Sequence, residues 1–439
     1  MDKFLITGGI PLKGEVSLCG AKNSGFKLMI ASLYSDEPCT IHNFSKIGDI
    51  VSTADIIKEL GGEVELGQNH IMKVVGRGIK KQSISDTIGR LSRASTYFIG
   101  PLLHRFGKAI IPIPGGCKIG KRPVDRHLEG IKALGAKIEI ENDYYVISAK
   151  KLEGTDFVFP KNTHGGTDVM IIAAAVAEGK TVLENAAQEP EVDDLISFLN
   201  LMGAKIRREE PRTIVIDGVE KLYGTDYTVM FDRNEAVTFA CAALATKGDV
   251  FVRQADPKNL ASFLEAVQKT GGGYEVENRG IRFYYKKPLK AYNITTGPYP
   301  GFMTDWMSLW GILMTQAKGE SIIHETIFEN RFAFINVLKK MGADAELFNP
   351  KVDSPEDLYN FNLEDDKPEY FHAAKIKGTP LKAVKEEITD VRTGASLILA
   401  SLIAEGESEL LGIEHVDRGY EDLDKRLRDL GANIKRVRA

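Results

Sequence analysis

A short glycine-centred signature occurs six times along the 439-residue chain, and it constrains the fold more than any other feature. In each copy an apolar residue, a glycine and a second small residue separate a helical stretch from an alternating one. The copies are Leu60-Gly61-Gly62, Leu134-Gly135-Ala136, Met202-Gly203-Ala204, Thr270-Gly271-Gly272 (with a polar first residue), Met341-Gly342-Ala343 and Leu430-Gly431-Ala432. Glycine suits the left-handed residue that ends a helix, and a strand is expected to follow. The spacing of about 70 residues is typical of a repeated supersecondary unit, so six copies predict two domains of three units each.

Small apolar residues fill a helical stretch upstream of several signatures, at 169–179, 236–245 and 394–406. These stretches are apolar on nearly every face, which predicts buried helices that pack on one another. A strand and an amphipathic helix then lead into the glycine, so each unit is expected to be mixed α/β with helices inside. The alternative, that the signature is only a common way to end a helix, does not explain six spaced copies. An acidic segment, 349–368, lengthens one interval and predicts a solvated surface insertion.

Composition excludes several classes of protein. The chain is too long for one ordinary core, and its formal net charge of -4 gives no overall attraction to nucleic acid or to an anionic membrane. Its four cysteines form no CxxC pair, which argues against a zinc site and a disulfide framework. The N-terminus has no apolar signal-peptide core, and no window reaches the ~18 apolar residues of a membrane helix. We therefore expect a soluble cytoplasmic protein.

Cys117 is the candidate catalytic thiol. It lies within 112–127, between glycines on both sides and among the cations Lys118, Lys121 and Arg122. Neighbouring positive charge stabilises a thiolate, so this cysteine can act as an acid or as a nucleophile. The other three cysteines are interpreted as packing residues.

Three further features suit an anionic substrate. Lys22 is expected at a helix N-terminus, where it can bind phosphate or carboxylate, although a solvated lysine is the default interpretation. Asp305 begins a buried helix, either as a functional carboxylate or as the helix N-cap. Arginines near segment ends can bind carboxylate or phosphate through two parallel hydrogen bonds, although each alone could form a surface salt bridge. These arginines are Arg93, Arg331, Arg392 and Arg418.

Together these segments resemble the enolpyruvyl transferases, and most closely the branch that acts on UDP-N-acetylglucosamine. The likeness covers nearly the whole chain and is carried by GAKNS, IPGGCKIGKRPVDRH, ENAAQEPEVDDL, HETIFENRF and HVDRGYEDL. It implies an α/β fold of two inside-out α/β barrels, each built from three repeated units. The first barrel would comprise 22–229 and carry the Cys117 loop. The second would be discontinuous, comprising 1–21 and 230–439.

The resemblance also implies a reaction and a site. The enolpyruvyl group of phosphoenolpyruvate would pass to the 3-hydroxyl of UDP-N-acetylglucosamine with release of phosphate, the first committed step of peptidoglycan synthesis, without cofactor or metal. Cys117 would be the general acid and the thiol attacked by fosfomycin, and Asp305 would be the base. Lys22, Arg122 and Arg418 would hold the phosphate and carboxylate of phosphoenolpyruvate, with Arg392 nearby. Contacts to the UDP-sugar would come from Asn23, Arg93, Arg122, Pro123, Val124, Asp125, Arg126, Lys161, Thr163, His164 and Ile327. Asp305 and Arg331 would also bind substrate.

Three departures from the family pattern leave alternatives open. Thr163-His164-Gly165-Gly166 stands where Ser-Val-Gly-Ala is common, and Arg126 stands where an apolar residue is usual. Glu235-Ala236-Val237-Thr238 stands where Glu-Thr-Gly-Thr is usual. An enolpyruvyl transferase for another nucleotide is therefore an alternative. A non-catalytic paralogue that binds a UDP-sugar is another, although Cys117, Asp305 and Lys22 are all present. The expected partners are the two small substrates, with no nucleic acid or membrane, in a monomer or weak homo-oligomer.

Overall fold

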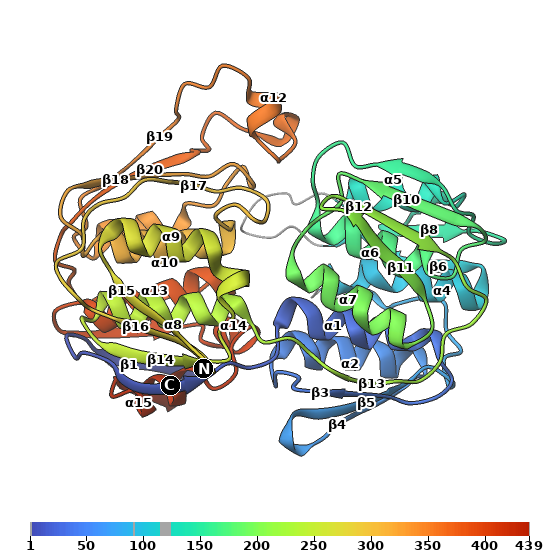
Figure 1. The fold of residues 1–439 in the computed structure, drawn as a ribbon, viewed down its shortest axis with the longest axis horizontal. Coiled ribbons are helices and arrows are strands. Elements are labelled where there is room, and N and C mark those ends of the chain that lie inside the picture. Colours follow the sequence, from blue (N-terminus) through green and yellow to red (C-terminus); the bar gives the residue numbers. More distant parts are fainter. Residues whose placement is uncertain (1, 91–92, 115–123, 439) are drawn as a thin grey trace. The chain divides into compact units, whose positions relative to one another are not determined.

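The structure is a computed structural model that describes residues 2–90, 93–114 and 124–438. The chain divides into two compact units (Figure 1). The first unit contains the described residues between 20 and 230, and the second contains 2–19 and 231–438. The chain therefore passes from one unit to the other after residue 19 and again after residue 230.

Backbone hydrogen bonds fix the chain on each side of these two passages. In the first unit, the N–H of Ala21 donates to the carbonyl of Met230 over 2.8 Å. In the second unit, the N–H of Asp232 donates to the carbonyl of Cys19 over 2.9 Å. The short N-terminal segment is thereby paired with the C-terminal two hundred residues in one unit.

The first unit contains three small sheets. One has the order β13-β3-β5-β4 and is formed by β3 (Cys39–His42), β4 (Glu63–Leu66), β5 (Ile71–Val75) and β13 (Asp226–Thr228). The next has the order β6-β8-β7 and is formed by β6 (Lys108–Pro112), β7 (Lys137–Glu141) and β8 (Tyr144–Ser148). The last has the order β11-β12-β10-β9 and is formed by β9 (Asp156–Val158), β10 (Lys180–Glu184), β11 (Lys205–Glu210) and β12 (Thr213–Asp217).

The second unit repeats this plan. Its sheet β15-β16-β14-β2 is formed by β2 (Lys13–Ser17), β14 (Asp249–Arg253), β15 (Gly273–Glu277) and β16 (Gly280–Tyr284). Sheet β17-β18-β20-β19 is formed by β17 (Ile294–Thr295), β18 (Glu320–His324), β19 (Ala345–Phe348) and β20 (Ala373–Lys377). Sheet β21-β22-β1-β23 is formed by β1 (Asp2–Thr7), β21 (Lys385–Glu387), β22 (Glu407–Leu411) and β23 (Asn433–Arg438). Each of these three sheets joins one parallel pair to two antiparallel pairs.

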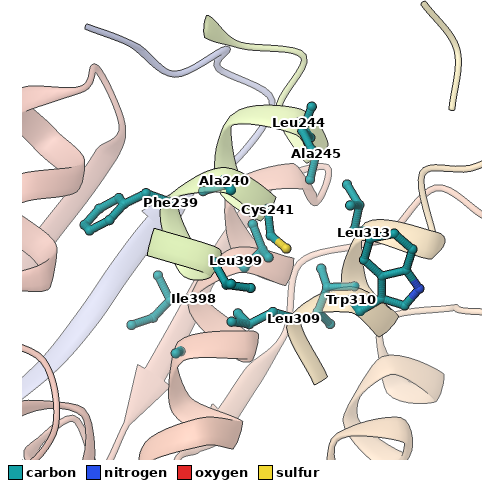
Figure 2. Packing of buried hydrophobic residues seen from close by; sticks show 14 of the residues in the cluster. Phe239, Ala240, Cys241, Leu244, Ala245, Leu309, Trp310, Leu313, Ile398 and Leu399 are labelled. Carbon is teal, nitrogen blue, oxygen red and sulfur yellow. The ribbon is translucent and has the colours of Figure 1, made fainter. Parts of the chain in front are cut away.

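Three buried helices form the centre of the second unit: α8 (Arg233–Ala245), α10 (Thr304–Met314) and α13 (Val391–Ile403). Figure 2 shows how Cys241 from α8, Trp310 from α10 and Leu399 from α13 meet in one apolar cluster. The corresponding helices of the first unit are α1 (Lys22–Ala31), α4 (Ile99–Phe106) and α6 (His164–Ala174). The predicted buried helices are therefore present, although α6 ends five residues before Gly179. A helix apolar on all sides needs this central position to remove its surface from water.

Amphipathic helices precede the six signature glycines: α2 (Gly48–Leu60), α5 (Asp125–Ala133), α7 (Pro190–Leu201), α9 (Ala261–Thr270), α11 (Ala333–Lys340) and α15 (Leu423–Asp429). All six glycines have φ between +82° and +107°, a conformation that costs glycine little and other residues more. A strand begins within three residues of each glycine. The six-fold repeat, three units to each half, is confirmed.

The acidic insertion is only partly solvated. It contains the short helices α12 (Pro355–Leu358) and η5 (Leu363–Asp365), and α12 is drawn beyond β19 and β20 in Figure 1. Tyr359 and Phe361 are each 5% exposed and stack with ring centroids 4.9 Å apart. The N–H of Asn360 donates to the carbonyl of Thr326 over 2.7 Å. Most of the insertion is exposed or half-buried, as predicted for a solvated surface segment, and only these anchor residues bury their surface against the unit.

Across the described ranges, we find no helix with both the length and the apolar composition to cross a membrane.

Candidate active site

Asp305 is held by two arginines in the second unit. It is the second residue of α10, and Met303 occupies the N-cap position, so the interpretation of Asp305 as the N-cap is wrong. Its Oδ1 accepts a hydrogen bond from Arg331 over 2.7 Å, and its Oδ2 accepts one from Arg392 over 2.9 Å. The Asp305, Arg331 and Arg392 side chains are 22%, 9% and 13% exposed. One carboxylate between two guanidinium groups leaves a local positive charge that suits an anionic substrate.

Arg392 is positioned by the start of α13 and by a tyrosine. Asp390 caps the helix and accepts a hydrogen bond from the N–H of Arg392 over 3.0 Å. The guanidinium of Arg392 lies 3.3 Å from the hydroxyl of Tyr420. Burial opposes the charge on Arg392, but the attraction of Asp305, Tyr420 and Asp232 outweighs it and raises the pKa of Arg392. Arg392 is therefore a permanent cation beside the Asp305 carboxylate.

Arg418 lies close in sequence to the same tyrosine. It follows the short helix α14 (Glu414–Asp417), and its backbone N–H donates to the carbonyl of Glu414 over 3.2 Å. The side chain is half-buried. Because Tyr420 lies two residues further on and contacts Arg392, the segment carrying Arg418 is tied to the arginine that holds Asp305.

Glu325 joins the start of α10 to the turn that carries Ile327. Its Oε2 accepts a hydrogen bond from the Thr304 hydroxyl over 2.9 Å. Its Oε1 accepts from the N–H groups of Ile327 and Phe328 over 2.8 and 3.0 Å. Burial raises the pKa of Glu325, against the attraction of Arg331 and these hydrogen bonds. This fully buried carboxyl positions two of the predicted site residues, Asp305 and Ile327, relative to each other.

Replacing Glu325 by alanine is expected to lower the free energy of unfolding of the second unit by about 3 kcal/mol, because three donors lose a carboxylate partner. Urea denaturation followed by tryptophan fluorescence measures this unit specifically, since both tryptophans of the chain, Trp306 and Trp310, lie in α10. Glu320→Ala is the matched control, at the first residue of the strand β18 that ends just before Glu325. The Glu320 side chain is 39% exposed and pairs with Lys375 over 3.6 Å, so a loss below about 1 kcal/mol is expected. Equal losses for the two variants would contradict the role given to Glu325.

Lys22 and Asn23 begin α1 in the first unit. The N-cap residue, Ala21, offers no side-chain hydrogen bond to the helix. Lys22 Nζ lies 2.8 Å from Asp49 Oδ2, and the two side chains are 18% and 14% exposed. The interpretation of Lys22 as an ordinary solvated lysine is wrong, because Asp49 holds the ammonium at the helix N-terminus.

The N-termini of α5 and α6 bring several predicted UDP-sugar residues together in the first unit. Val124 is the N-cap residue of α5, and Arg126 is the second residue of this helix. Arg126 Nη1 donates to the carbonyl of Asn162 over 3.4 Å, and burial lowers the pKa of Arg126. Thr163 caps α6, with its Oγ1 accepting from the N–H of Gly166 over 3.1 Å. Arg126 is therefore joined directly to the turn 161–164.

The remaining predicted site residues fall at other places. Arg93 begins the short helix η3 (Arg93–Phe98) of the first unit, and Asp125 begins α5. Cys117, Arg122 and Pro123 lie outside the described residues.

Sequence reasoning missed the charged residues that hold these side chains in place. Asp49 and Glu325 fit ordinary helix and strand patterns and give no signal of their own. Lys27 and Asp168 do give a sequence signal, because each is a charged residue inside an otherwise apolar helical run. A charge at a buried helical position needs a partner of opposite sign, although the sequence does not say which.

The class of protein is defined by two features: the repeated sheets around central helices, and the carboxylate held between two arginines. The chain belongs to the enolpyruvyl transferase family, since the family described as EPSP synthase (3-phosphoshikimate 1-carboxyvinyltransferase) matches residues 6–427. Among its relatives, the UDP-N-acetylglucosamine 1-carboxyvinyltransferase 3 of Caldanaerobacter subterraneus subsp. tengcongensis is 42% identical and covers 100% of both chains. The UDP-N-acetylglucosamine 1-carboxyvinyltransferase of Protochlamydia amoebophila is 41% identical over 100% of this chain and 95% of its own. The resemblance inferred from the motifs is confirmed.

Solved structures show the same fold at lower identity. The enolpyruvyl transferase NikO from Streptomyces tendae superposes with a TM-score of 0.86 at 22% identity, covering 100% of this chain and 99% of its own. EPSP synthase from Acinetobacter baumannii superposes with a TM-score of 0.74 at 19% identity, covering 100% of both. The predicted enolpyruvyl transferase fold is confirmed.

Proposed function

We propose that this protein transfers the enolpyruvyl group of phosphoenolpyruvate to the 3-hydroxyl of UDP-N-acetylglucosamine and releases phosphate. One observation carries the proposal above the others: the 42% identity, over the full length of both chains, to a protein named for this activity. The retained Asp305, Lys22 and Cys117 support catalysis rather than binding alone.

The addition step needs a base that takes the proton of the sugar hydroxyl and an acid that protonates the methylene carbon. Asp305 takes the proton of the sugar hydroxyl as its oxygen bonds to C2 of phosphoenolpyruvate, and Cys117 gives a proton to the C3 methylene. The resulting tetrahedral ketal then returns a proton from C3 to the Cys117 thiolate while the C2–O bond to phosphate breaks. Phosphate leaves with the proton that Asp305 had taken, and the enol double bond is restored on the sugar ether. A carboxylate has about four acceptor positions, so Asp305 can engage the hydroxyl while its arginines remain.

Fixed cations balance the charge of the substrate. Phosphoenolpyruvate carries roughly three negative charges, which converging cations stabilise as the tetrahedral intermediate forms. In this proposal Lys22, Arg122 and Arg418 bind its phosphate and carboxylate, with Arg392 nearby. The proton acceptor Asp305 is kept in position by Arg331 and Arg392, the contacts seen in the second unit.

The wider role follows from the reaction. The product is the first committed precursor of peptidoglycan, which places the protein in cell wall biogenesis and thereby in cell shape and division. We assign it to the cytoplasm, as a monomer or weak homo-oligomer, with fosfomycin as an inhibitor that alkylates Cys117. The domains are proposed to be 22–229 and the discontinuous 1–21 with 230–439.

A phosphate-release assay tests the proposed acceptor. The purified protein is incubated with phosphoenolpyruvate and, separately, with UDP-N-acetylglucosamine, UDP-glucose or UMP. Phosphate release that requires UDP-N-acetylglucosamine is the expected result. Release with UMP only would support a transferase for another nucleotide, which Arg126 and the Thr163–Gly166 turn left open. No release with any acceptor, together with binding of the UDP-sugar, would support the non-catalytic alternative.

A further inference from the structure

Two charged residues are buried in the first unit beside the turn 161–164. Lys27 from α1 is 1% exposed and Asp168 from α6 is 0% exposed. Lys27 Nζ lies 2.5 Å from Asp168 Oδ2. Burial raises the pKa of Asp168 to about 7, against the attraction of Lys27. Removing such a pair from water is costly, and replacing it by apolar residues is often neutral or stabilising, so its presence calls for a role beyond stability.

The same lysine contacts the first residue of α6. Lys27 Nζ lies 2.8 Å from Nε2 of His164, and Asp168 Oδ2 lies 3.5 Å from that nitrogen. An ammonium group has donors and no acceptor, so Nε2 of His164 must accept. The single ring proton of a neutral imidazole then belongs on Nδ1, because a second proton on Nε2 would face the Lys27 charge directly.

His164 is placed where a donor is useful. It is the first residue of an 11-residue helix capped by Thr163, and its side chain remains 24% exposed. Unpaired N–H groups and the helix dipole favour an anion at such an N-terminus. An Nδ1–H from His164 adds a directed donor there.

Several titratable or charged groups surround this position on the neighbouring elements. The charges of Glu189, the N-cap residue of α7, and of Glu191 in α7 act on Asp168. A Cβ at Gly165 would lie 2.7 Å from His127 Nε2 of α5 and 3.1 Å from the Tyr97 hydroxyl of η3. Arg126 of α5 reaches the carbonyl of Asn162. The lysine ammonium, at 2.8 Å, is the cation nearest to the His164 ring among the contacts resolved in the described chain.

We propose that Lys27 and Asp168 are positioning residues that hold His164 as a neutral Nδ1–H donor for the diphosphate of the nucleotide-sugar acceptor. This inference rests on the proposed function for the identity of the acceptor. Asp168 compensates the buried charge of Lys27, and Lys27 fixes which ring nitrogen of His164 carries the proton. Neither residue is required to touch the substrate.

Removing the lysine charge removes the preference of the His164 ring for a proton on Nδ1. In Lys27→Met, Asp168 becomes the closest ionisable partner of Nε2, and its carboxylate form favours a proton there. At low pH Asp168, which has lost the cation that lowers its pKa, is protonated and donates to Nε2, so the neutral ring still presents Nδ1–H to the substrate. At high pH the ring keeps only the Nε2 proton, and Nδ1 turns a lone pair toward the anionic phosphates. The affinity of the variant for the nucleotide-sugar therefore depends on pH, whereas that of the natural protein does not.

Nuclear magnetic resonance of the ligand-free protein tests the tautomer without any assumption about activity. Ring ¹⁵N and ¹³C shifts of histidine are recorded from about pH 6 to about pH 8.5, with His164 assigned by the signal lost in His164→Asn. A neutral ring protonated on Nδ1 throughout is expected for the natural protein. A ring that titrates in this range, or that carries its proton on Nε2, overturns the proposal, and this measurement needs no folded variant at position 27.

Steady-state kinetics test the consequence for the acceptor. In Lys27→Met the KM for UDP-N-acetylglucosamine is expected to rise about tenfold near pH 8.5 and less than about threefold near pH 6. The KM for phosphoenolpyruvate and kcat should change less than about twofold. Lys27→Arg, which keeps a cationic donor, should restore most of the affinity, and Lys27→Met with Asp168→Asn should lose the pH dependence.

The outcomes separate this inference from the proposed function. Equal changes in kcat and in both KM values at every pH would show a merely structural role and overturn the inference. An absence of phosphate release by the natural protein with UDP-N-acetylglucosamine would overturn the proposed function, while the histidine spectra would still decide the tautomer.

Discussion

Asp305→Asn is expected to lower kcat for phosphate release by about 10³-fold, because general base catalysis contributes typically 10²–10⁴-fold and an amide cannot take the hydroxyl proton. The amide also turns an N–H₂ group toward one of the two arginines that now donate to the carboxylate. The KM for UDP-N-acetylglucosamine should change far less than kcat, since the lost interaction belongs to the transition state. Initial rates with both substrates saturating, with and without the substitution, measure the effect.

Two comparisons sharpen this result. Asp305→Glu keeps a carboxylate at a shifted position, so an intermediate loss is expected. Asp344→Asn is the matched control in the same unit, because that side chain is 62% exposed and pairs with Lys377 over 3.5 Å. Its activity should match that of the unsubstituted protein. A kcat for Asp305→Asn within tenfold of the original, in a variant with unchanged tryptophan fluorescence, would remove Asp305 from the role of base.

Cys117→Ser is expected to reduce kcat by at least about 10²-fold, because a serine hydroxyl is a far weaker acid than a thiol and cannot supply the methylene proton at neutral pH. The same substitution should abolish alkylation by fosfomycin. Intact mass spectrometry after incubation with the drug and UDP-N-acetylglucosamine is expected to show one adduct on the original chain and none on the variant.

The other thiols make this labelling experiment specific. Burial raises the pKa of Cys39 and of Cys241, and burial together with the Glu235 charge raises that of Cys19. All three therefore remain protonated at neutral pH and react slowly, since the thiolate is the nucleophile. Cys19→Ser, the control at the most exposed of the three, should still accept one adduct. An adduct on Cys117→Ser, or none on the original chain, would contradict the assignment of the reactive thiol.

The repeat and the apolar runs determined the fold from sequence alone. Gly61 and Gly431 stand 370 residues apart in number, yet each ends a helix with positive φ and introduces a strand, because backbone sterics act locally and identically in every copy. The largely apolar runs at 236–245 and 394–406 could be placed inside a unit for a similar reason: the hydrophobic effect depends on composition and periodicity, which the sequence displays. The specific motifs around Lys22, Cys117 and Arg418 gave the family.

Only the tertiary structure decided which charges meet. Nothing in the sequence pairs Asp305 with Arg392, 87 positions away, or Lys27 with Asp168, 141 positions away, because such contacts depend on how separate helices pack. In the sequence Glu325 is an ordinary residue after a strand. In the structure its carboxylate accepts three hydrogen bonds. The local sequence pattern predicts that a residue is buried. The partner that stabilises its buried polar group is decided by non-local packing. Fold and family could therefore be inferred from the chain itself, and the side chains that orient the candidate site could not.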